Sequence, residues 1–266
     1  FLFNILYIHI AMDPNIQITA TDNVLTFTAS ECHVSLANAL RRTITSDIST
    51  VVFKVEEQHN KEEYDFMVNT TRFNNEFLKQ RLSCIPIHIT DLNTPIRQLQ
   101  VEVDETNTGN TIKNITTEHF KIKNIESDTY LDHSEVAKIF PPDKQTGDYI
   151  LFCKLKQKIS NEIPGEQVKF TARMSIGTAR ESGTYNVSST CAYACTPDKD
   201  RQIIEWAKIK DTLQSADVNI AIEERNWLLL DGKRVVLPDS FDFKIESVGV
   251  FKNIEIVKKG CEILLD

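Results

Sequence analysis

The side chains with the clearest potential for chemistry are the cysteines and their neighbouring histidines. The 266-residue chain has six cysteines. They are scattered along its whole length, as Cys32, Cys84, Cys153, Cys191, Cys195 and Cys261. A thiol beside an imidazole can act as an activated nucleophile, and the pairs to consider are Cys32 with His33 and Cys84 with His88. Because proximity in sequence says little about reach in space, a stand-alone intracellular enzyme using Cys/His chemistry stays open as the alternative.

Signatures of other catalytic classes and of metal sites are missing. The chain has no phosphate-binding loop, no GxSxG elbow and no HExxH helix. Structural zinc needs clustered ligands, typically opening with C-x2-4-C. Cys191 and Cys195 lack a second Cys/His pair at suitable spacing, and a strand would place both on one face, which favours small buried residues. We therefore predict no catalytic residue, no metal site and no cofactor, and reduced intracellular thiols.

Two adjacent arginines, Arg41 and Arg42, are the other candidates for specific contacts. A guanidinium forms forked hydrogen bonds with carboxylates and carbonyls, so such a pair suits a protein–protein interface. The plainer interpretation is an amphipathic core helix with a solvated arginine face. Net charge is -8, which opposes an autonomous nucleic-acid-binding module.

The segment 34–53 must position these arginines. Leu36, Leu40 and Ile44 recur every fourth residue, which predicts a helix with one apolar face. Asn38 falls on the opposite face, and Ser35 is the predicted N-cap.

Alternation of apolar and polar residues predicts the other main elements. The patterns indicate a hairpin over 16–29 and strands over 51–55, 85–89, 99–103, 168–174, 191–195 and 241–245. A charged loop is predicted over 56–65. Helices are predicted after Asn74, in one or two pieces over 198–231 with Trp206 and Trp227 as core or interface anchors, and after Asn253. The last helix carries an apolar stripe of Ile254, Val257, Cys261 and Leu264.

Three blocks of the sequence resemble a known family. SLANALRR (35–42) resembles the signature helix of alpha-type assembly subunits of RNA polymerases: the bacterial alpha N-terminal domain, the archaeal D subunit and the third-largest subunit of RNA polymerase II. NNEFLKQRLSCIPIHI (74–89) is similar to the second family signature, in which Glu76, Arg81, Leu82, Ile85 and Pro86 match. The ending DSFDFKIESVGVF (239–251) with its following helix resembles the close of the family's dimerisation domain.

The resemblance implies the fold and the domain limits. The fold is α+β: an alpha-type RNA polymerase dimerisation domain, with an antiparallel sheet and packed helices, interrupted by an inserted mostly-β domain. The dimerisation domain would comprise 12–89 and 166–266, and the insert 90–165. Residues 1–11 are apolar but too short to span a bilayer, and they are interpreted as a tail or an upstream extension.

The resemblance also implies a role and partners. The chain would be a non-catalytic assembly subunit of a DNA-directed RNA polymerase, pairing with a smaller alpha-like subunit to dock the two largest subunits, with DNA contacted only indirectly and no membrane involved. The implied dimer interface is Leu36, Leu40, Ile44, Ile254, Val257 and Leu264. The implied large-subunit contacts are Asn38, Arg41, Arg42, Glu76 and Arg81.

The sequence departs from the family pattern at two places. The insert has one cysteine, Cys153, whereas some relatives carry a zinc loop or an iron-sulfur cluster there. The usual His-Ala-Lys loop is Ala179-Arg180-Glu181 here, which puts that loop's family contacts in doubt.

The blocks 74–89 and 239–251 also resemble versions encoded by large DNA viruses. The expected location is intracellular: the nucleus for a cellular protein, a cytoplasmic viral factory or the virion for a viral one.

Overall fold

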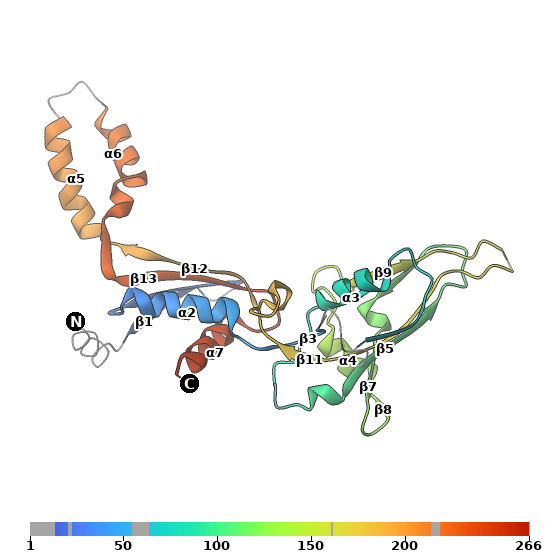
Figure 1. Cartoon of the computed structure of the whole chain (residues 1–266). Coiled ribbons are helices and arrows are strands. Elements are labelled where there is room, and N and C mark those ends of the chain that lie inside the picture. Colours follow the sequence, from blue (N-terminus) through green and yellow to red (C-terminus); the bar gives the residue numbers. More distant parts are fainter. Residues whose placement is uncertain (1–13, 21–22, 55–63, 161, 214–218, 266) are drawn as a thin grey trace. The chain divides into compact units, whose positions relative to one another are not determined.

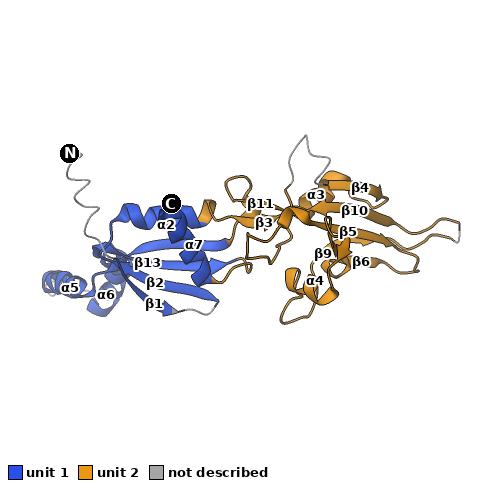
Figure 2. Ribbon diagram, turned by 90° about the horizontal axis from the view of Figure 1, so that it is seen from below, with its two compact units in different colours: residues 1–44, 188–247, 253–266 blue, residues 45–187, 248–252 orange. Residues whose placement is uncertain are grey.

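The computed structural model describes residues 14–20, 23–54, 64–160, 162–213 and 219–265 (Figure 1). The chain divides into two compact units (Figure 2). Unit 1 comprises residues 1–44, 188–247 and 253–266, and unit 2 comprises residues 45–187 and 248–252. Both contain antiparallel sheets with packed helices, which confirms the predicted α+β class.

Unit 1 contains a four-stranded antiparallel sheet in the order β1-β2-β13-β12. Its strands are β1 (Asn15–Ala20), β2 (Val24–Ser30), β13 (Val236–Ser247) and β12 (Ser188–Pro197). The pairing of β1 with β2 confirms the predicted hairpin over 16–29. Phe27 and Phe243 stack face to face across the central pair, with ring centroids 4.8 Å apart. On the polar face, the Thr28 hydroxyl donates to the Asp242 carboxylate at 2.7 Å.

Two helices supply the other layer of unit 1: α2 (Val34–Ser46) and α7 (Asn253–Leu265). The prediction that Ser35 caps α2 is wrong, because the helix begins one residue earlier. The backbone N–H of Ser35 donates to His33 Nδ1 at 3.2 Å, and that of Leu36 donates to the His33 carbonyl at 3.0 Å. The His33 imidazole therefore takes the capping role usually filled by a small polar side chain.

Gly260 lets α7 approach α2 closely. A Cβ atom at this position would lie 2.8 Å from Ile44 Cγ1 and 3.3 Å from Leu40 Cδ1. We expect Gly260→Val to destabilise unit 1 by about 2 kcal/mol, as overpacking of a close contact typically does. Urea unfolding monitored by circular dichroism measures the loss. Lys258→Val, on an exposed face of the same helix, controls for the helix propensity of valine; an equal loss in both variants would contradict the prediction.

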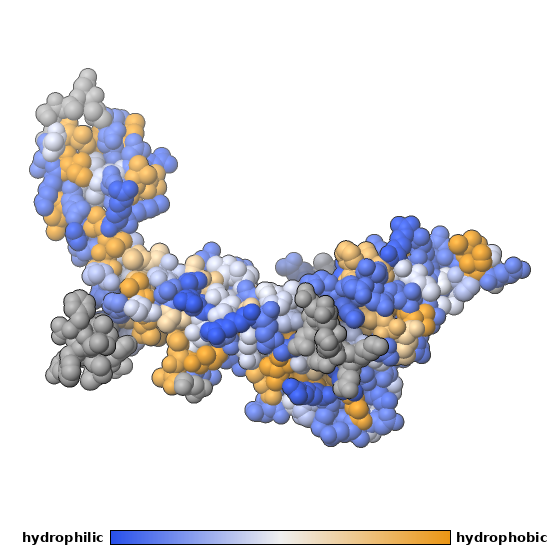
Figure 3. Space-filling model, viewed as in Figure 1, coloured by the Kyte–Doolittle hydropathy of each residue, from blue (hydrophilic) through white to orange (hydrophobic). Residues whose placement is uncertain are grey.

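A helical hairpin connects β12 to β13. It consists of α5 (Lys199–Leu213) and α6 (Ile220–Leu229), which confirms the predicted helical region. Trp206 and Trp227 contact each other with ring centroids 5.7 Å apart, and Trp206 is the one buried residue of these two helices. The Gln202 side chain donates to the Gly232 carbonyl at 2.7 Å at the base of the hairpin. Several of its large apolar side chains are exposed (Figure 3): Ile203, Ile204, Ile222, Leu228, Leu229 and Leu230.

Unit 2 is built around a five-stranded antiparallel sheet in the order β4-β10-β5-β7-β8. These strands are β4 (Tyr64–Asn69), β10 (Gln167–Arg173), β5 (Leu99–Thr106), β7 (Lys121–Asn124) and β8 (Thr129–Tyr130). Two further pairs join β6 (Lys113–Thr116) to β9 (Leu151–Leu155) and β11 (Ser175–Gly177) to β3 (Thr50–Val52). The α-helices are α3 (Asn75–Ser83) and α4 (His133–Ile139). Short 3-10 turns occupy Ile96–Gln98, Thr117–His119, Gly183–Tyr185 and, in unit 1, Gly232–Arg234.

An aromatic cluster forms the centre of the unit 2 core. The Phe120 ring meets the rings of Phe140 and Phe152 edge-on at 5.4 and 5.9 Å, and Phe152 lies 5.2 Å from Phe170. The predicted alternation over 168–174 is confirmed, since Val168, Phe170, Ala172 and Met174 are all buried.

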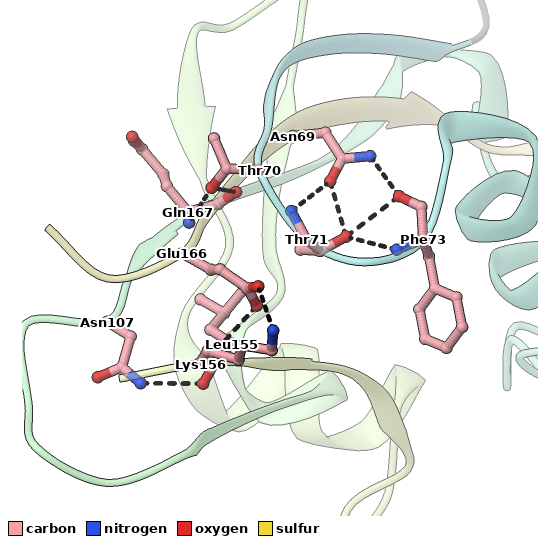
Figure 4. A network of polar contacts seen from close by, with 9 residues as sticks. All are labelled: Asn69, Thr70, Thr71, Phe73, Asn107, Leu155, Lys156, Glu166 and Gln167. Atoms are coloured by element: carbon pink, nitrogen blue, oxygen red, sulfur yellow. Dashed lines mark hydrogen bonds and ion pairs between the residues drawn. The ribbon is translucent and has the colours of Figure 1, made fainter. Parts of the chain in front are cut away.

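Polar contacts hold the strand ends of unit 2 together (Figure 4). The Asn69 side-chain oxygen accepts from the backbone N–H and the hydroxyl of Thr71 at 3.0 and 2.7 Å. The Asn107 side-chain amide donates to the Leu155 carbonyl at 2.9 Å. The Asn74 side chain accepts from the Phe77 N–H at 2.9 Å, which confirms the predicted cap of α3.

Some predicted elements of unit 2 differ from the structure. The strand predicted over 85–89 forms no ladder, because Pro86 has no N–H to donate. Ile85 and Ile87 are buried all the same, and the N–H of His88 donates to the Ile139 carbonyl at 3.0 Å. The strand predicted over 51–55 is limited to Thr50–Val52. Of the predicted charged loop over 56–65, residues 56–63 lie outside the described residues.

The two compact units do not follow the predicted domain limits. Strands β4 and β10, which come from the predicted dimerisation segments, share a sheet with β5 from the predicted insert. Backbone pairing thus joins residues 64–69 and 167–173 to the segment 90–165. The assignment of 12–89 and 166–266 to one discontinuous functional domain stays a prediction.

Candidate functional site

Helix α7 has two faces with different surroundings. Asn253, Ile256 and Gly260 are buried, and this face lies against α2 and against strands β2 and β13. Another face carries the predicted stripe: Ile254 and Leu264 are 40% and 39% exposed, Val257 is half-buried and Cys261 is exposed. Among the described residues, this apolar stripe along three turns of the helix is thus partly exposed, which is a feature of surfaces that bind other proteins.

The other three residues of the predicted dimer interface lie on helix α2 and differ in their exposure. Ile44 is 1% exposed and belongs to the chain's own core. Leu40 is half-buried and lies beside Gly260. Leu36 is 45% exposed and adds an apolar side chain to the surface. The structure therefore brings Leu40 and Ile44 together beneath α7 and leaves Leu36 outside.

Asn38 orients Arg41. Asn38 and Arg41 are one helical turn apart. The Nε and Nη2 atoms of Arg41 donate to the Asn38 side-chain oxygen at 3.2 and 2.9 Å. The next residue, Arg42, is exposed. The positive charge of Arg41 also reaches Cys191, where it opposes the effect of burial, which raises the pKa of the thiol to about 11. Cys191 is therefore protonated near neutral pH.

Glu76 and Arg81 lie in unit 2, on α3. Glu76 is exposed in the first turn, where a carboxylate complements the helix dipole. Arg81 donates from Nε to the Phe152 carbonyl at 2.7 Å and from Nη2 to the Leu151 carbonyl at 3.0 Å. Arg81 thus ties α3 to strand β9, a structural role that the sequence alone did not indicate.

An apolar groove beside Arg81 was also missed. It has a volume of about 390 Å³, and Phe73, Phe77, Ile150 and Leu151 lie along it. Phe73 and Phe77 stack at 6.0 Å between centroids, and the Arg81 guanidinium lies 5.9 Å from the Phe73 ring. The residues on its two sides, Phe73 and Phe77 on one and Ile150 and Leu151 on the other, are about 70 residues apart in sequence. The spacing of Phe73 and Phe77 was therefore the one local signal of the groove.

The cysteines and histidines do not form a reactive site in the described part of the chain. Burial raises the pKa of Cys32, and it raises that of Cys153 to about 12. Burial lowers the pKa of His88. No three His, Cys, Asp or Glu side chains among the described residues come together as a metal site would require. Cys32 and Cys153 are buried, and buried, protonated thiols are poor nucleophiles. Cys84, Cys195 and Cys261 are exposed, so the expectation that Cys191 and Cys195 are both buried small residues is wrong for Cys195.

Comparison with known families decides the identity. The sequence model of the RNA polymerase Rpb3/Rpb11 dimerisation domain matches residues 26–266, nearly the whole chain. The chain belongs to this family. It is similar to the DNA-directed RNA polymerase subunit Rpo3 of Pyrococcus furiosus, with 22% identity over 92% of this chain and 90% of the relative. It is also similar to a conjugation stage-specific protein of Tetrahymena thermophila, with 21% identity over 90% of this chain and 87% of the relative.

Membership confirms the main inference from the sequence. The chain is a non-catalytic RNA polymerase subunit of the Rpb3/Rpo3 type, and its dimerisation domain implies an alpha-like partner subunit within a polymerase. The alternative of a stand-alone enzyme is not supported. Nothing in these comparisons supports a viral origin. None of the described helices is long and apolar enough to cross a bilayer.

Proposed function

We propose that this chain pairs with a smaller alpha-like subunit, and that the heterodimer forms the platform on which the two largest polymerase subunits assemble. The observation that carries the proposal is the partly exposed apolar stripe of α7, formed by Ile254, Val257, Cys261 and Leu264. Removing such side chains from water contributes roughly 25 cal/mol per Å² of apolar surface buried. A facing helix can interdigitate with the stripe at the usual 8–10 Å between helix axes.

The polar side of α2 is the proposed contact to a large subunit. Asn38 holds the Arg41 guanidinium in a defined orientation, and Arg42 extends from the next position. Pre-ordered guanidinium groups lose less entropy when they bind carboxylates or carbonyls of a partner. Glu76 and Arg81 extend the proposed contacts to unit 2, with Arg81 already engaged by β9. The net charge of -8 fits a subunit that meets DNA only through the complex.

The location follows from this role. A subunit of this kind works where transcription takes place, which is inside the cell. We propose the nucleus for a cellular source; a viral factory or the virion would apply only to a viral source.

Co-purification of the tagged chain from its native source, with mass spectrometry of the recovered proteins, tests the proposal. We expect two very large polymerase subunits and one small alpha-like chain. Charge reversal at Arg41 and Arg42 to glutamate is expected to reduce recovery of the large subunits at least tenfold while the small chain remains bound.

The matched control reverses the adjacent pair Lys233 and Arg234, which is exposed and lies beyond the helical hairpin. It makes the same change in net charge, and we expect no loss of either class of partner. If the unaltered chain brings down no polymerase subunit, the proposal is wrong. If both double variants lose the large subunits equally, the assignment of Arg41 and Arg42 is wrong.

A further inference from the structure

We infer that strand β1 belongs to the partner-binding surface, and that one amphipathic helix of the alpha-like partner lies across β1 beside α7. This inference rests on the proposed heterodimer and names a further part of its interface. Its evidence is the combination of strand register, helix placement and exposure in unit 1.

The register places the isoleucines of β1 on the helix-covered face of the sheet. Ile16 pairs with Ala29 and Ile18 pairs with Phe27, and directly paired residues of an antiparallel ladder share a face. Phe27 in turn pairs with Phe243 on β13, so this apolar face is continuous from β1 through β13.

Among the described residues, helices α2 and α7 leave the β1 end of this face uncovered. Helix α7 lies against β2 and β13, and α2 lies beside α7, with Leu40 and Ile44 next to Gly260. In Figure 2 both helices lie toward the β13 side, and β1 forms the opposite edge. Ile16 and Ile18 are 53% and 56% exposed, whereas Phe27 on the neighbouring strand is 4% exposed.

The dimensions of the uncovered region fit one helix. Adjacent strands are about 4.8 Å apart and packed helix axes about 8–10 Å apart. A helix packed beside α7, which covers β2 and β13, would therefore lie over β1. It would contact Ile16 and Ile18 from above and the outward stripe of α7 from the side. Strand β1 has no charged residue over Asn15–Ala20, so the facing side of the partner helix must be apolar.

Addition of a partner strand to the free edge of β1 fits the structure less well. Pro14 immediately before β1 has no N–H for a ladder, and the β1–β2 register shifts between Ile18 and Ala20. A proline and an irregularity are features that discourage pairing at sheet edges. The exposed side chains also stand on the face of the sheet rather than along its rim.

Calorimetry with the full chain and the small alpha-like chain recovered by co-purification tests the inference. We expect Ile16→Asp combined with Ile18→Asp to raise Kd at least tenfold. The matched control, Asn15→Asp with Gln17→Asp, introduces two carboxylates on the other face of the same strand, where these residues pair with Ser30 and Thr28, and is expected to change Kd less than threefold. Circular dichroism and thermal melting establish that both variants are folded.

A photo-cross-linking phenylalanine analogue at Ile16 gives a second readout that keeps an apolar side chain. We expect cross-links to one segment of the partner with apolar residues at helical spacing. Cross-links to a segment with strand alternation, or unchanged Kd in the β1 variant while α7 variants lose binding, would overturn the inference and leave the proposed function intact. If both α7 and β1 variants bind normally, the assignment of the interface to these two elements is wrong; if the unaltered chain does not bind the small chain, the proposed heterodimer itself is wrong.

Discussion

Replacement of Val257 and Leu264 by aspartate is expected to abolish binding of the alpha-like partner, with Kd raised at least 100-fold. Leu264 is 39% exposed and Val257 is half-buried, and neither belongs to the buried set of α7, which is Asn253, Ile256 and Gly260. Burying a Val or Leu side chain contributes about 1.5–3 kcal/mol, and an unpaired carboxylate in an apolar contact adds a further cost. A 100-fold change in Kd corresponds to about 2.7 kcal/mol of binding free energy, which is less than the sum expected from the two side chains, so 100-fold is a lower bound on the loss of affinity.

The stability of the lone chain serves as the first control, because the replaced residues are not part of its buried core. We expect the thermal midpoint of the double variant to stay within about 3 °C of the parent, since surface substitutions usually change stability little. Lys258→Asp with Glu262→Asp places aspartates on another exposed face of α7 and is expected to keep normal affinity. Normal affinity of the Val257/Leu264 variant would show that α7 is not the dimer contact.

Gly165→Ala is expected to destabilise unit 2 by about 3 kcal/mol, the largest stability effect that we expect of a single methyl group in this chain. A Cβ atom at Gly165 would lie 2.0 Å from the Asn107 carbonyl oxygen and 2.9 Å from that of Lys156. Both obstacles are backbone atoms, which cannot rotate away as a flexible side chain can. Asn107 is buried, and its side-chain amide donates to the Thr111 and Leu155 carbonyls at 2.8 and 2.9 Å. Overpacking against such a fixed point costs at the upper end of the usual range.

Urea unfolding monitored by far-ultraviolet circular dichroism measures this effect. Gly183→Ala is the matched control, because nothing lies within 4 Å of a Cβ atom at that position. A loss below about 1 kcal/mol at Gly165, or an equal loss at Gly183, would show that the backbone around Asn107 relaxes more easily than its hydrogen bonds suggest.

The sequence predicted α7 but not which of its faces the chain keeps for itself. Apolar periodicity identified Ile254, Val257, Cys261 and Leu264, of which Val257 is half-buried and the other three are exposed. The inward face depends on Gly260, which contributes close approach rather than hydropathy, and on Asn253, whose side chain donates to the Asn23 carbonyl at 3.0 Å. A periodicity argument counts apolar side chains, so it cannot identify a close helix contact at a glycine, which has no side chain.

Contacts between distant segments were beyond the same kind of argument. Nothing near Arg81 indicates that its partners are the Leu151 and Phe152 carbonyls, and no local pattern joins β4 and β10 to β5 in one sheet. Strand alternation, by contrast, gave the buried face correctly over 168–174, whereas over 85–89 it gave the buried Ile85 and Ile87 but not the absence of a ladder. The family signatures supplied the function because they carry information that hydropathy does not.

The helical hairpin has a spectroscopic consequence. Both tryptophans of the chain, Trp206 and Trp227, lie in it and contact each other, whereas the sheet beneath contains none. Indole emission therefore reports on α5 and α6 alone. Helices of this length are marginally stable in water unless they pack against other elements. Since α5 and α6 bury a single side chain, we expect them to have low stability. A thermal scan followed by tryptophan fluorescence should show a transition well below the loss of sheet signal, and a partner that covers the hairpin should bring the two transitions together.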